Sequence, residues 1–294
     1  MADVMTEKRP ILHTQSSWGI ALCELRRNPG AIAGAVVLLL LILMAVFAPV
    51  LAPYDPIKVV PQASFQPPSA EHWLGADRYG RDVLSRIVYG ARISLTVGLI
   101  SVGLAAAVGV PAGLLAGWDT GTTSALIMRF TDAMLALPGI LLALSIIAVL
   151  GPGLSNAMIA VGISNIPTYI RLVRGGVLSA RENVYVDAAR VIGCSTTRIM
   201  YQHILPNVVA PVIVLSTLGI ATSILSAASL SFLGLGAQPP TPDWGTTVSE
   251  GRDVLDFAWW ISTFPSLVIM ITVLAINLLG DGLRDALDPR LRQR

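Results

Sequence analysis

Apolar residues occur along this chain in long uninterrupted runs, and the charged residues are confined to the segments between them. Five windows contain no Asp, Glu, Lys or Arg: 28–54, 93–118, 133–170, 199–242 and 257–280. A helix needs about 20 mainly apolar residues to cross the core of a bilayer. The runs are continuous rather than alternating, which is typical of membrane-spanning helices and not of barrel strands.

The two longest windows have to be divided. In the window 133–170, Gly151-Pro152-Gly153 predicts a turn between two helices. In the window 199–242, the stretch from Gly234 to Pro242 is rich in Gly and Pro and predicts a loop after a single helix. The pattern therefore predicts an all-α membrane protein with six spans, at about 31–52, 93–117, 125–150, 157–177, 207–230 and 260–281.

Composition supports the same class of protein. Only 13% of the 294 residues are charged and 54% are hydrophobic, whereas a soluble domain carries about 25% charged residues. The net charge of +2 does not predict nucleic-acid binding, and two cysteines cannot form a disulfide scaffold. The three histidines lie far apart and lack the spacing of metal ligands, so no metal site is expected.

The distribution of Lys and Arg predicts the orientation in the membrane. If the N-terminus is cytoplasmic, 14 of the 20 basic residues fall in cytoplasmic segments. Cytoplasmic loops carry an excess of Lys and Arg. We therefore expect both termini in the cytoplasm.

Two sizeable segments, 53–91 and 233–259, then lie outside. Gly80–Arg92 has the pattern of a basic amphipathic helix, which we expect to lie along the outer membrane surface. Trp259 and Trp260 are expected at the outer interface of the sixth span, as in an aromatic belt.

The longest inner loop, 178–206, contains two short helical patterns. The first covers about 183–192 and is followed by Gly193, which allows a sharp bend. Ser195 is a candidate N-cap for the second, and Pro206 marks the start of the fifth span. Such a loop, with small exposed residues and a glycine hinge, can fit a groove on a soluble partner. The alternative is a plain interfacial connector.

The residues of this loop resemble the EAA loop of type I ABC importer permeases. Asp187-Ala188-Ala189 is followed after three residues by Gly193, and nine residues later by His203, one further residue and Leu205-Pro206. All the spacings of that family pattern match. Asp187 stands where the family has Glu, and His203 stands where it has Ile.

Other segments in the same order resemble the C subunits of dipeptide and oligopeptide permeases, a subfamily that includes glutathione and nickel permeases. They are Leu74–Arg86, Arg129–Pro138, Ser231–Gly245 and Asn277–Pro289. The resemblance therefore implies the type I ABC importer fold and a noncatalytic permease subunit for di- or oligopeptides. Glutathione, nickel or another small solute remains the alternative cargo.

The resemblance also implies that this chain is a multi-pass protein of the inner membrane. It implies three kinds of partner: a homologous permease subunit forming a heterodimer, two ABC ATPase subunits, and an extracytoplasmic substrate-binding protein. No G-x-x-x-x-G-K-[ST] is present, so we expect ATP and Mg²⁺ to be used by the ATPases and no cofactor to be held here. The residues expected to couple to the ATPase are Asp187, Ala188, Ala189, Arg190, Gly193, Leu205 and Pro206.

Arg129 and Asp132 are three residues apart near the inner end of the third span, and ionisable groups at that depth are usually paired. They are expected to form a gate or a purely structural pair. Polar candidates for lining the path occur in the fourth and fifth spans: Asn165, Thr168, Tyr169, Ser216, Thr217, Thr222 and Ser223.

Two other classes of protein are less consistent with the sequence. A stand-alone secondary transporter would need membrane carboxylates for ion coupling, and Asp132 is the only acid well inside an apolar segment. A membrane enzyme of the H-E-x-x-H or G-x-S-x-G type lacks its motif here. The expected organisation is a cytoplasmic segment 1–28, a first span with an outer segment 29–91, a transmembrane domain 92–282 containing the loop 178–206, and a cytoplasmic tail 283–294.

Overall fold

The computed structural model describes residues 25–287, and within this range the chain is mostly helical. The expected N-terminal segment lies mostly, and the expected tail partly, outside the described residues. The helices are α2 (Pro29–Val46), α3 (Ala48–Leu51), η1 (Pro61–Ala63), α4 (Val83–Trp118), α5 (Thr122–Leu135), α6 (Gly139–Leu150), α7 (Leu154–Ala180), α8 (Val184–Val191), α9 (Thr196–Arg198), η2 (Ile199–Ile204), α10 (Leu205–Phe232), α11 (Trp244–Arg252), α12 (Leu255–Ala258) and α13 (Trp260–Leu287).

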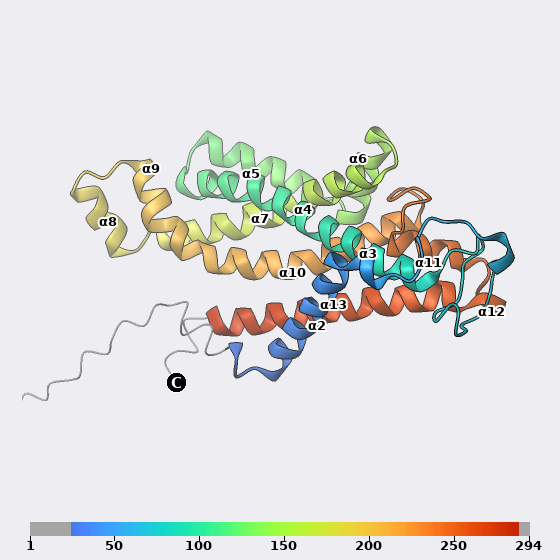
Figure 1. Cartoon of the computed structure of the whole chain (residues 1–294). Helices are drawn as coiled ribbons and strands as arrows, with labels where there is room; N and C mark the ends of the chain where they lie inside the picture. The colour runs from blue at the N-terminus through green and yellow to red at the C-terminus, as the bar shows by residue number, and fades with distance from the viewer. Residues whose placement is uncertain (1–24, 288–294) are drawn as a thin grey trace, which may run out of the picture.

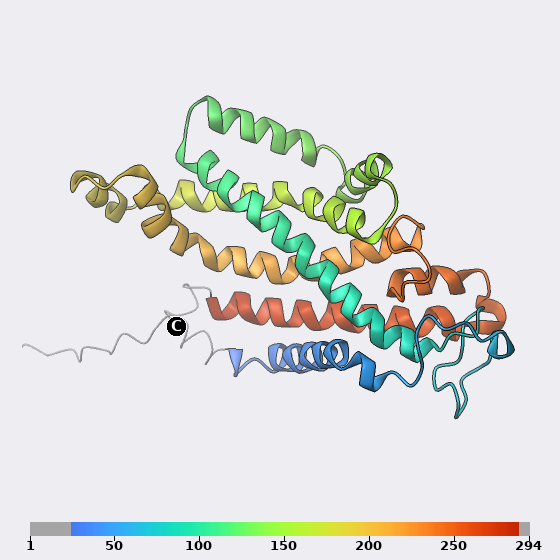
Figure 2. The ribbon, with the colours of Figure 1, turned by 45° about the horizontal axis from the view of Figure 1, so that its top comes forward.

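The long helices lie side by side in one elongated bundle (Figures 1 and 2). At one end, residues 181–204, which include α8 and α9, project as a compact unit that we call the hairpin. At the opposite end, residues 52–82 fold together with α11 and α12, and we call this unit the cap. The two ends are therefore separated by the full length of α4, which has 36 residues.

Four helices among the described residues are long and apolar enough to cross a membrane. They are α2, α4, α13 and the continuous helix Thr196–Phe232, to which α9, η2 and α10 all contribute. The bent pair of α5 and α6 makes a fifth if it is counted as one span. α7 is helical over 27 residues, as expected, but is not among these apolar helices. The count of six spans and the cytoplasmic position of the termini remain predictions.

The third span differs from the expected single helix over 125–150. α5 ends at Leu135, α6 begins at Gly139, and the two axes meet at 93°. Pro138 stands at the break, where it lacks an N–H and pushes the preceding residue out of the α-helical region. The prediction of one continuous helix was therefore wrong.

Small residues allow α4 and α7 to approach closely along their length. A side-chain carbon added at Gly109, Gly113 or Gly117 would lie 2.5–2.7 Å from a side-chain atom of α7. These glycines are four residues apart, so they share one face of α4. Close approach of helices at small residues is typical of packing in lipid, where apolar burial alone does not drive association. Small residues therefore serve helix packing along this contact.

Candidate functional site

The hairpin is held to the bundle by one apolar face. Val186 and Ala189 of α8 are buried in a cluster with Val177 of α7 and with Ile199 and Ile204 of the following segment. The expected short helix at 183–192 is confirmed as α8, Val184–Val191. Its opposite face is turned outward, so the hairpin combines an anchored side with a free one.

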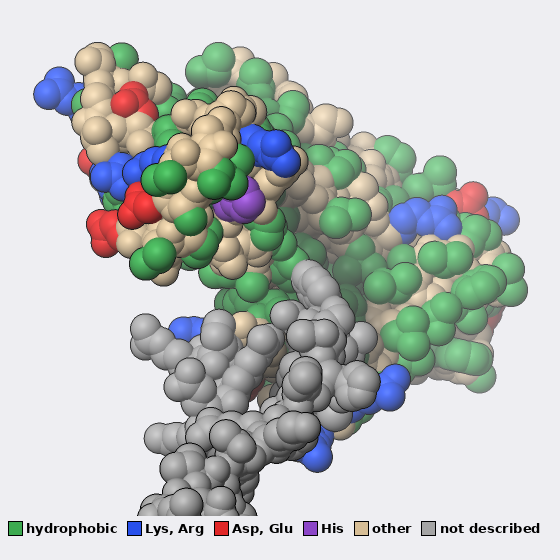
Figure 3. All heavy atoms as spheres, turned by 90° about the vertical axis from the view of Figure 1, so that its left-hand side faces the viewer, with side chains coloured by type: hydrophobic (Ala, Val, Ile, Leu, Met, Phe, Trp, Pro, Cys, Tyr) green, Lys and Arg blue, Asp and Glu red, His purple; other side chains and the backbone are tan. Residues whose placement is uncertain are grey.

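The free side of the hairpin is unusually apolar. Val184 is 83% exposed, Val191 87% and Ile192 78%. Figure 3, the view onto this end, shows hydrophobic, acidic and basic side chains together on its surface. Asp187 and Arg190 of α8 are both exposed. Large apolar side chains grouped on a surface and rimmed by polar ones are typical of protein-binding sites.

Gly193 turns the chain sharply after α8. Its φ of +83° lies in the left-handed region that favours glycine. The N–H of Gly193 donates to the carbonyl of Arg190, and the N–H of Cys194 donates to that of Ala189. No atom lies within 4 Å of the position of an added side chain, so the turn depends on backbone conformation and not on space.

The second half of the hairpin runs without interruption into α10. The Ser195 side chain accepts a 3.4 Å hydrogen bond from the N–H of Arg198, which confirms it as an N-cap. A π-helical segment, Ile199–Ile204, contains His203 and leads into α10. Leu205 packs against the buried cluster of the hairpin, and Pro206 stands in the first turn of α10, as expected. The hairpin is thus continuous with a membrane-spanning helix.

Side chains also link the hairpin to the ends of neighbouring helices. The guanidinium of Arg190 lies 5.1 Å from the ring centroid of Trp118, the last residue of α4. Asn207 of α10 donates to the hydroxyl oxygen of Tyr185 in α8 at 3.0 Å. Asp187 and Arg190 form an exposed pair at 3.3 Å. Of the seven predicted coupling residues, the structure therefore places Asp187, Ala188, Ala189, Arg190 and Gly193 in one unit, with Leu205 and Pro206 at its base.

The expected pair of Arg129 with Asp132 was wrong. Asp132 instead accepts a 2.8 Å hydrogen bond from Arg171 of α7, and both side chains are exposed. The interaction therefore joins α5 to α7 across two helices instead of lying within one. Arg171 was not identified from the sequence as the partner of Asp132, because helical spacing points to an oppositely charged residue three positions away in the same helix. Its position directly after the charge-free window 133–170 was the available signal.

Four of the polar residues predicted in the fourth and fifth spans bond to one another between helices. The Asn165 amide donates to the Ser223 hydroxyl oxygen at 3.2 Å, and the Tyr169 hydroxyl donates to Ser216 at 3.1 Å. Both bonds join α7 to α10. Whether any of the predicted residues lines a path remains a prediction.

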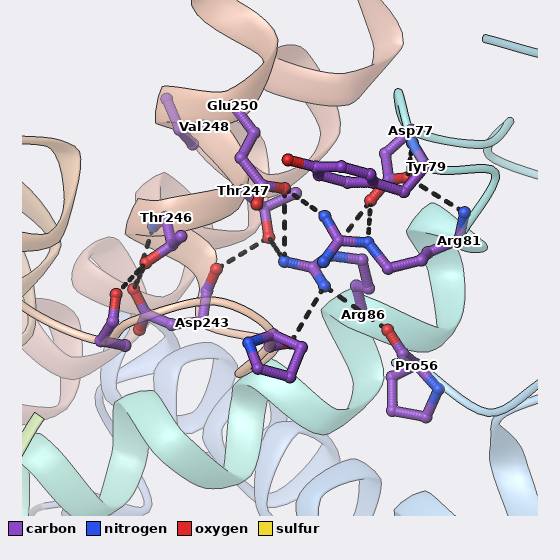
Figure 4. Close-up of polar contacts among 12 residues, drawn as sticks. Pro56, Asp77, Tyr79, Arg81, Arg86, Asp243, Thr246, Thr247, Val248 and Glu250 are labelled. Carbon is purple, nitrogen blue, oxygen red and sulfur yellow. Dashed lines mark hydrogen bonds and ion pairs between the residues drawn. The ribbon is translucent and has the colours of Figure 1, made fainter. Parts of the chain in front are cut away.

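The cap contains a network of buried charges (Figure 4). The guanidinium of Arg81 contacts the carboxylates of Asp77 and Glu250, the latter at 2.6 Å. Arg86 Nη2 lies 3.5 Å from Glu250 and 3.3 Å from the hydroxyl oxygen of Thr247. Arg86 is 1% exposed and Glu250 8%. The network joins residues 77–86 to α11, which is more than 160 positions away in the chain.

This network corrects the expectation for Gly80–Arg92. The segment is not a separate amphipathic helix on the membrane surface, because its greater part forms the first turns of α4, beginning at Val83 with Asp82 as the N-cap. Arg81 and Arg86 point into the protein, where carboxylates neutralise them. Trp260 was also assigned wrongly to an interfacial belt, since it is buried and donates from Nε1 to the carbonyl of Ala76. Trp259 is about half exposed.

Comparison with known proteins places this architecture in a family. Residues 109–293 match the family model described as binding-protein-dependent transport system inner membrane component. Residues 16–68 match the N-terminal TM domain of oligopeptide transport permease C.

The chain is similar to named transport proteins over most of its length. It is 49% identical over 271 residues to the di/tripeptide transport system permease protein DppC of Pseudomonas aeruginosa strain UCBPP-PA14, covering 90% of this chain and 89% of that protein. It is 48% identical to DppC of Alkalihalophilus pseudofirmus, covering 94% and 91%. It is also 49% identical to the glutathione transport system permease protein GsiD of Escherichia coli O157:H7, covering 91% and 88%.

Solved structures agree at the level of the fold. A chain of the MetNI methionine ABC transporter, in an inward-facing crystal form, superposes with a TM-score of 0.59 at 17% identity, covering 70% of this chain and 97% of that one. A second crystal form gives a TM-score of 0.55. The chain therefore belongs to the family of binding-protein-dependent transport system inner membrane components, and is a multi-pass permease subunit of the dipeptide and oligopeptide permease C type with the type I ABC importer fold.

Proposed function

We propose that this chain forms, with a homologous permease subunit, the inner-membrane path through which an ATP-driven importer carries di- and oligopeptides. The observation that carries the proposal is the similarity to two proteins named DppC at 48–49% identity over at least 90% of the chain. An extracytoplasmic binding protein would deliver the peptide at the cap.

The hairpin is proposed as the element that docks on the ATPase. It exposes Val184, Val191 and Ile192 on a unit whose opposite face is anchored by Val186 and Ala189. A partner that covers these three side chains removes apolar area from water at about 25 cal/mol per Å². Because η2 continues into α10 without a break, a push on the hairpin would reach a membrane helix directly. The partner ATPases would use ATP and Mg²⁺, and no cofactor is assigned to this chain.

The docking assignment is tested with Val191→Ser combined with Ile192→Ser. Both side chains are already exposed, so the double variant should fold normally but co-purify with less ATPase and transport less. Leu39→Ser on α2, an exposed apolar residue far from the hairpin, is the matched control and should retain the ATPase. Normal co-purification and normal uptake by the hairpin variant would show that the hairpin does not dock.

The cargo is tested separately by capturing the external binding protein and identifying its ligand by mass spectrometry. Di- or oligopeptides in the released fraction support the proposal. Glutathione is the second candidate, because GsiD of Escherichia coli is as similar to this chain as DppC of Pseudomonas aeruginosa is. A bound metal or glutathione would replace the peptide assignment. Proton-driven uptake by the lone chain would instead support a stand-alone secondary transporter.

A further inference from the structure

A groove of about 580 Å³ lies among α2, α4, α10 and α13. Its walls include Leu38, Ile42 and Val46 of α2 and Leu95 and Leu99 of α4. Ile220 of α10 and Ile276 of α13 also line it. The two walls meet beside the cap and separate toward the other end of the bundle (Figure 2).

The groove presents an almost purely apolar surface to whatever fills it. Its two threonines keep their hydroxyls within their own helices: Thr96 donates to the carbonyl of Arg92, and Thr217 donates to that of Ile213. Ile42 and Leu99 on its walls are exposed. These helices are long and apolar enough to cross a membrane, so this surface faces lipid wherever no other subunit covers it.

One cation stands in this lining, at the end where the two walls meet. Arg92 donates from Nε to the carbonyl of Ala45 at 3.1 Å and from Nη2 to that of Val46 at 3.2 Å, the last residues of α2. These carbonyls fix the guanidinium, no carboxylate among the described residues forms an ion pair with it, and neither bond uses Nη1. A fixed, exposed guanidinium is a good partner for a phosphate group.

The dimensions suit one leaflet of a bilayer. From Leu38 to Val46 the wall rises about 12 Å, at 1.5 Å per residue. Half of a hydrocarbon core is about 15 Å. A phospholipid whose phosphate lies at Arg92 would therefore lay most of one acyl chain along the groove.

We propose that this groove is a specific binding site for one anionic phospholipid, phosphatidylglycerol, in the leaflet on the side of the cap. Arg92 holds the phosphate, and the apolar walls hold an acyl chain. The uncompensated positive charge favours phosphatidylglycerol over the zwitterionic phosphatidylcholine. The lipid would fill the space between α2 and α4, which approach each other only near one end (Figure 2), while α13 packs closely against α2 at Gly34 and Gly282.

The test counts bound lipid by native mass spectrometry on the transporter extracted with its partners and titrated with dioleoyl phosphatidylglycerol or dioleoyl phosphatidylcholine. We expect one tightly bound phosphatidylglycerol per chain. Arg92→Gln should lower that affinity about fivefold, because one basic residue near a lipid surface contributes about 1 kcal/mol. Arg92→Lys should keep the preference, because it keeps the charge.

Two matched controls separate a site from general lipid contact. Arg78→Gln removes another exposed arginine of the cap, and Leu39→Trp enlarges an exposed residue of α2 that does not line the groove. Both should leave lipid binding unchanged, whereas Leu99→Trp should reduce binding of both lipids by filling the groove. Equal binding by the wild type and Arg92→Gln would overturn the proposal. Cross-linking of Ile42→Cys to another subunit would also overturn it, by showing that protein and not lipid occupies the groove.

Discussion

The two ends of this bundle differ in the kind of side chain that they bury. In the cap, the charged side chains Arg81, Arg86 and Glu250 are buried and neutralise one another, although Arg86 Nε and Glu250 Oε1 have no hydrogen-bond partner. In the hairpin, the apolar side chains Val191 and Ile192 are exposed, and no described part of the chain covers them. The cap neutralises its charges within the chain, whereas the hairpin leaves large apolar side chains exposed.

This difference indicates where rigidity and movement belong in the permease. Buried ion pairs hold residues 77–86 against α11 in one arrangement, because separating them would leave charges without partners. The hairpin is held by its anchored apolar face, by the stacking of Arg190 on Trp118 and by the hydrogen bond of Asn207 to Tyr185, and its ion pair Asp187–Arg190 is exposed. An external force can therefore displace the hairpin more readily than it can open the cap.

The largest expected effect comes from breaking the cap. Arg86→Ala leaves Glu250 and Asp77 with less compensation in a buried site, and Glu250→Ala leaves Asp77 as the one carboxylate shared by the two guanidiniums. Removing one partner of a buried ion pair costs about 3–5 kcal/mol. We expect either variant to lower the unfolding temperature in detergent strongly. Arg252→Ala, which breaks an exposed pair with Asp253, should cost at most about 1 kcal/mol.

If Arg86→Ala and Arg252→Ala unfolded at the same temperature, the buried ion pairs would not be what makes the cap rigid. The comparison with the hairpin would then lose its basis. Glu250→Gln provides an intermediate case, since it removes the charge and keeps the shape of the side chain.

The second effect is the loss of transport when the hairpin turn is disrupted. Gly193→Pro cannot adopt the φ of +83°, because the proline ring fixes φ near −65°. Uptake should be abolished while the cap and the bundle stay folded. Gly193→Ala should be milder, since the left-handed region costs an ordinary residue about 1–2 kcal/mol. Both are compared with Gly175→Ala, which alters an exposed glycine of α7 with no atom within 4 Å of the added carbon.

Uptake and ATP hydrolysis measured together distinguish the possible outcomes. Hydrolysis without uptake in Gly193→Pro would support coupling through the hairpin. Normal uptake would show that the turn has no part in coupling, even if the hairpin touches the ATPase.

The sequence predicted the hairpin well because its signals are local. The α8 pattern, the Gly193 turn and the Ser195 cap each depend on residues within one or two turns of helix. The cap could not be predicted in the same way. Arg81 and Glu250 are 169 positions apart, and nothing in their own neighbourhoods shows that they meet. In the local sequence pattern, the buried arginines near the start of α4 cannot be distinguished from those on the polar face of a surface helix.

The bend between α5 and α6 was only partly predictable from the sequence. Pro138 was visible, but the charge-free run around it suggested one continuous helix. Continuous hydropathy shows which residues are apolar and does not show the direction of the chain. Asp132 illustrates the same limit, since its partner Arg171 comes from another helix.

A smaller effect is expected from this exposed pair, which belongs to neither end. Asp132→Asn should cost about 0.2–1 kcal/mol in a double-mutant cycle with Arg171→Gln, as exposed ion pairs do. The exchanged variant Asp132→Arg with Arg171→Asp should recover part of the loss. Arg129→Gln should show no coupling to Asp132, whereas strong coupling would restore the pairing suggested by sequence alone. Uptake by the exchanged variant would show whether the pair is structural or part of a gate.

The smallest expected effect is the pH dependence of stability caused by Asp243. It tests whether a carboxylate buried in the cap without a cation beside it destabilises the fold. Asp243 caps α11 by accepting from the N–H of Thr246 at 3.0 Å. Burial raises the pKa of its carboxyl above the ordinary value of 3.8, although hydrogen bonds from Thr246 oppose this shift. A raised pKa means that the folded protein holds this proton more tightly than the unfolded chain does.

Ionisation of Asp243 therefore opposes folding at neutral pH, and the opposition disappears as the pH falls through the raised pKa. Asp243→Asn keeps a capping oxygen and does not titrate. Measured against that variant, the unfolding temperature of the wild type should rise as the pH is lowered from neutral. Other carboxylates affect both proteins equally and cancel in the difference. A difference that stays constant, or moves the other way, would mean that a neighbouring cation compensates the buried Asp243 carboxylate, as Arg81 compensates that of Asp77.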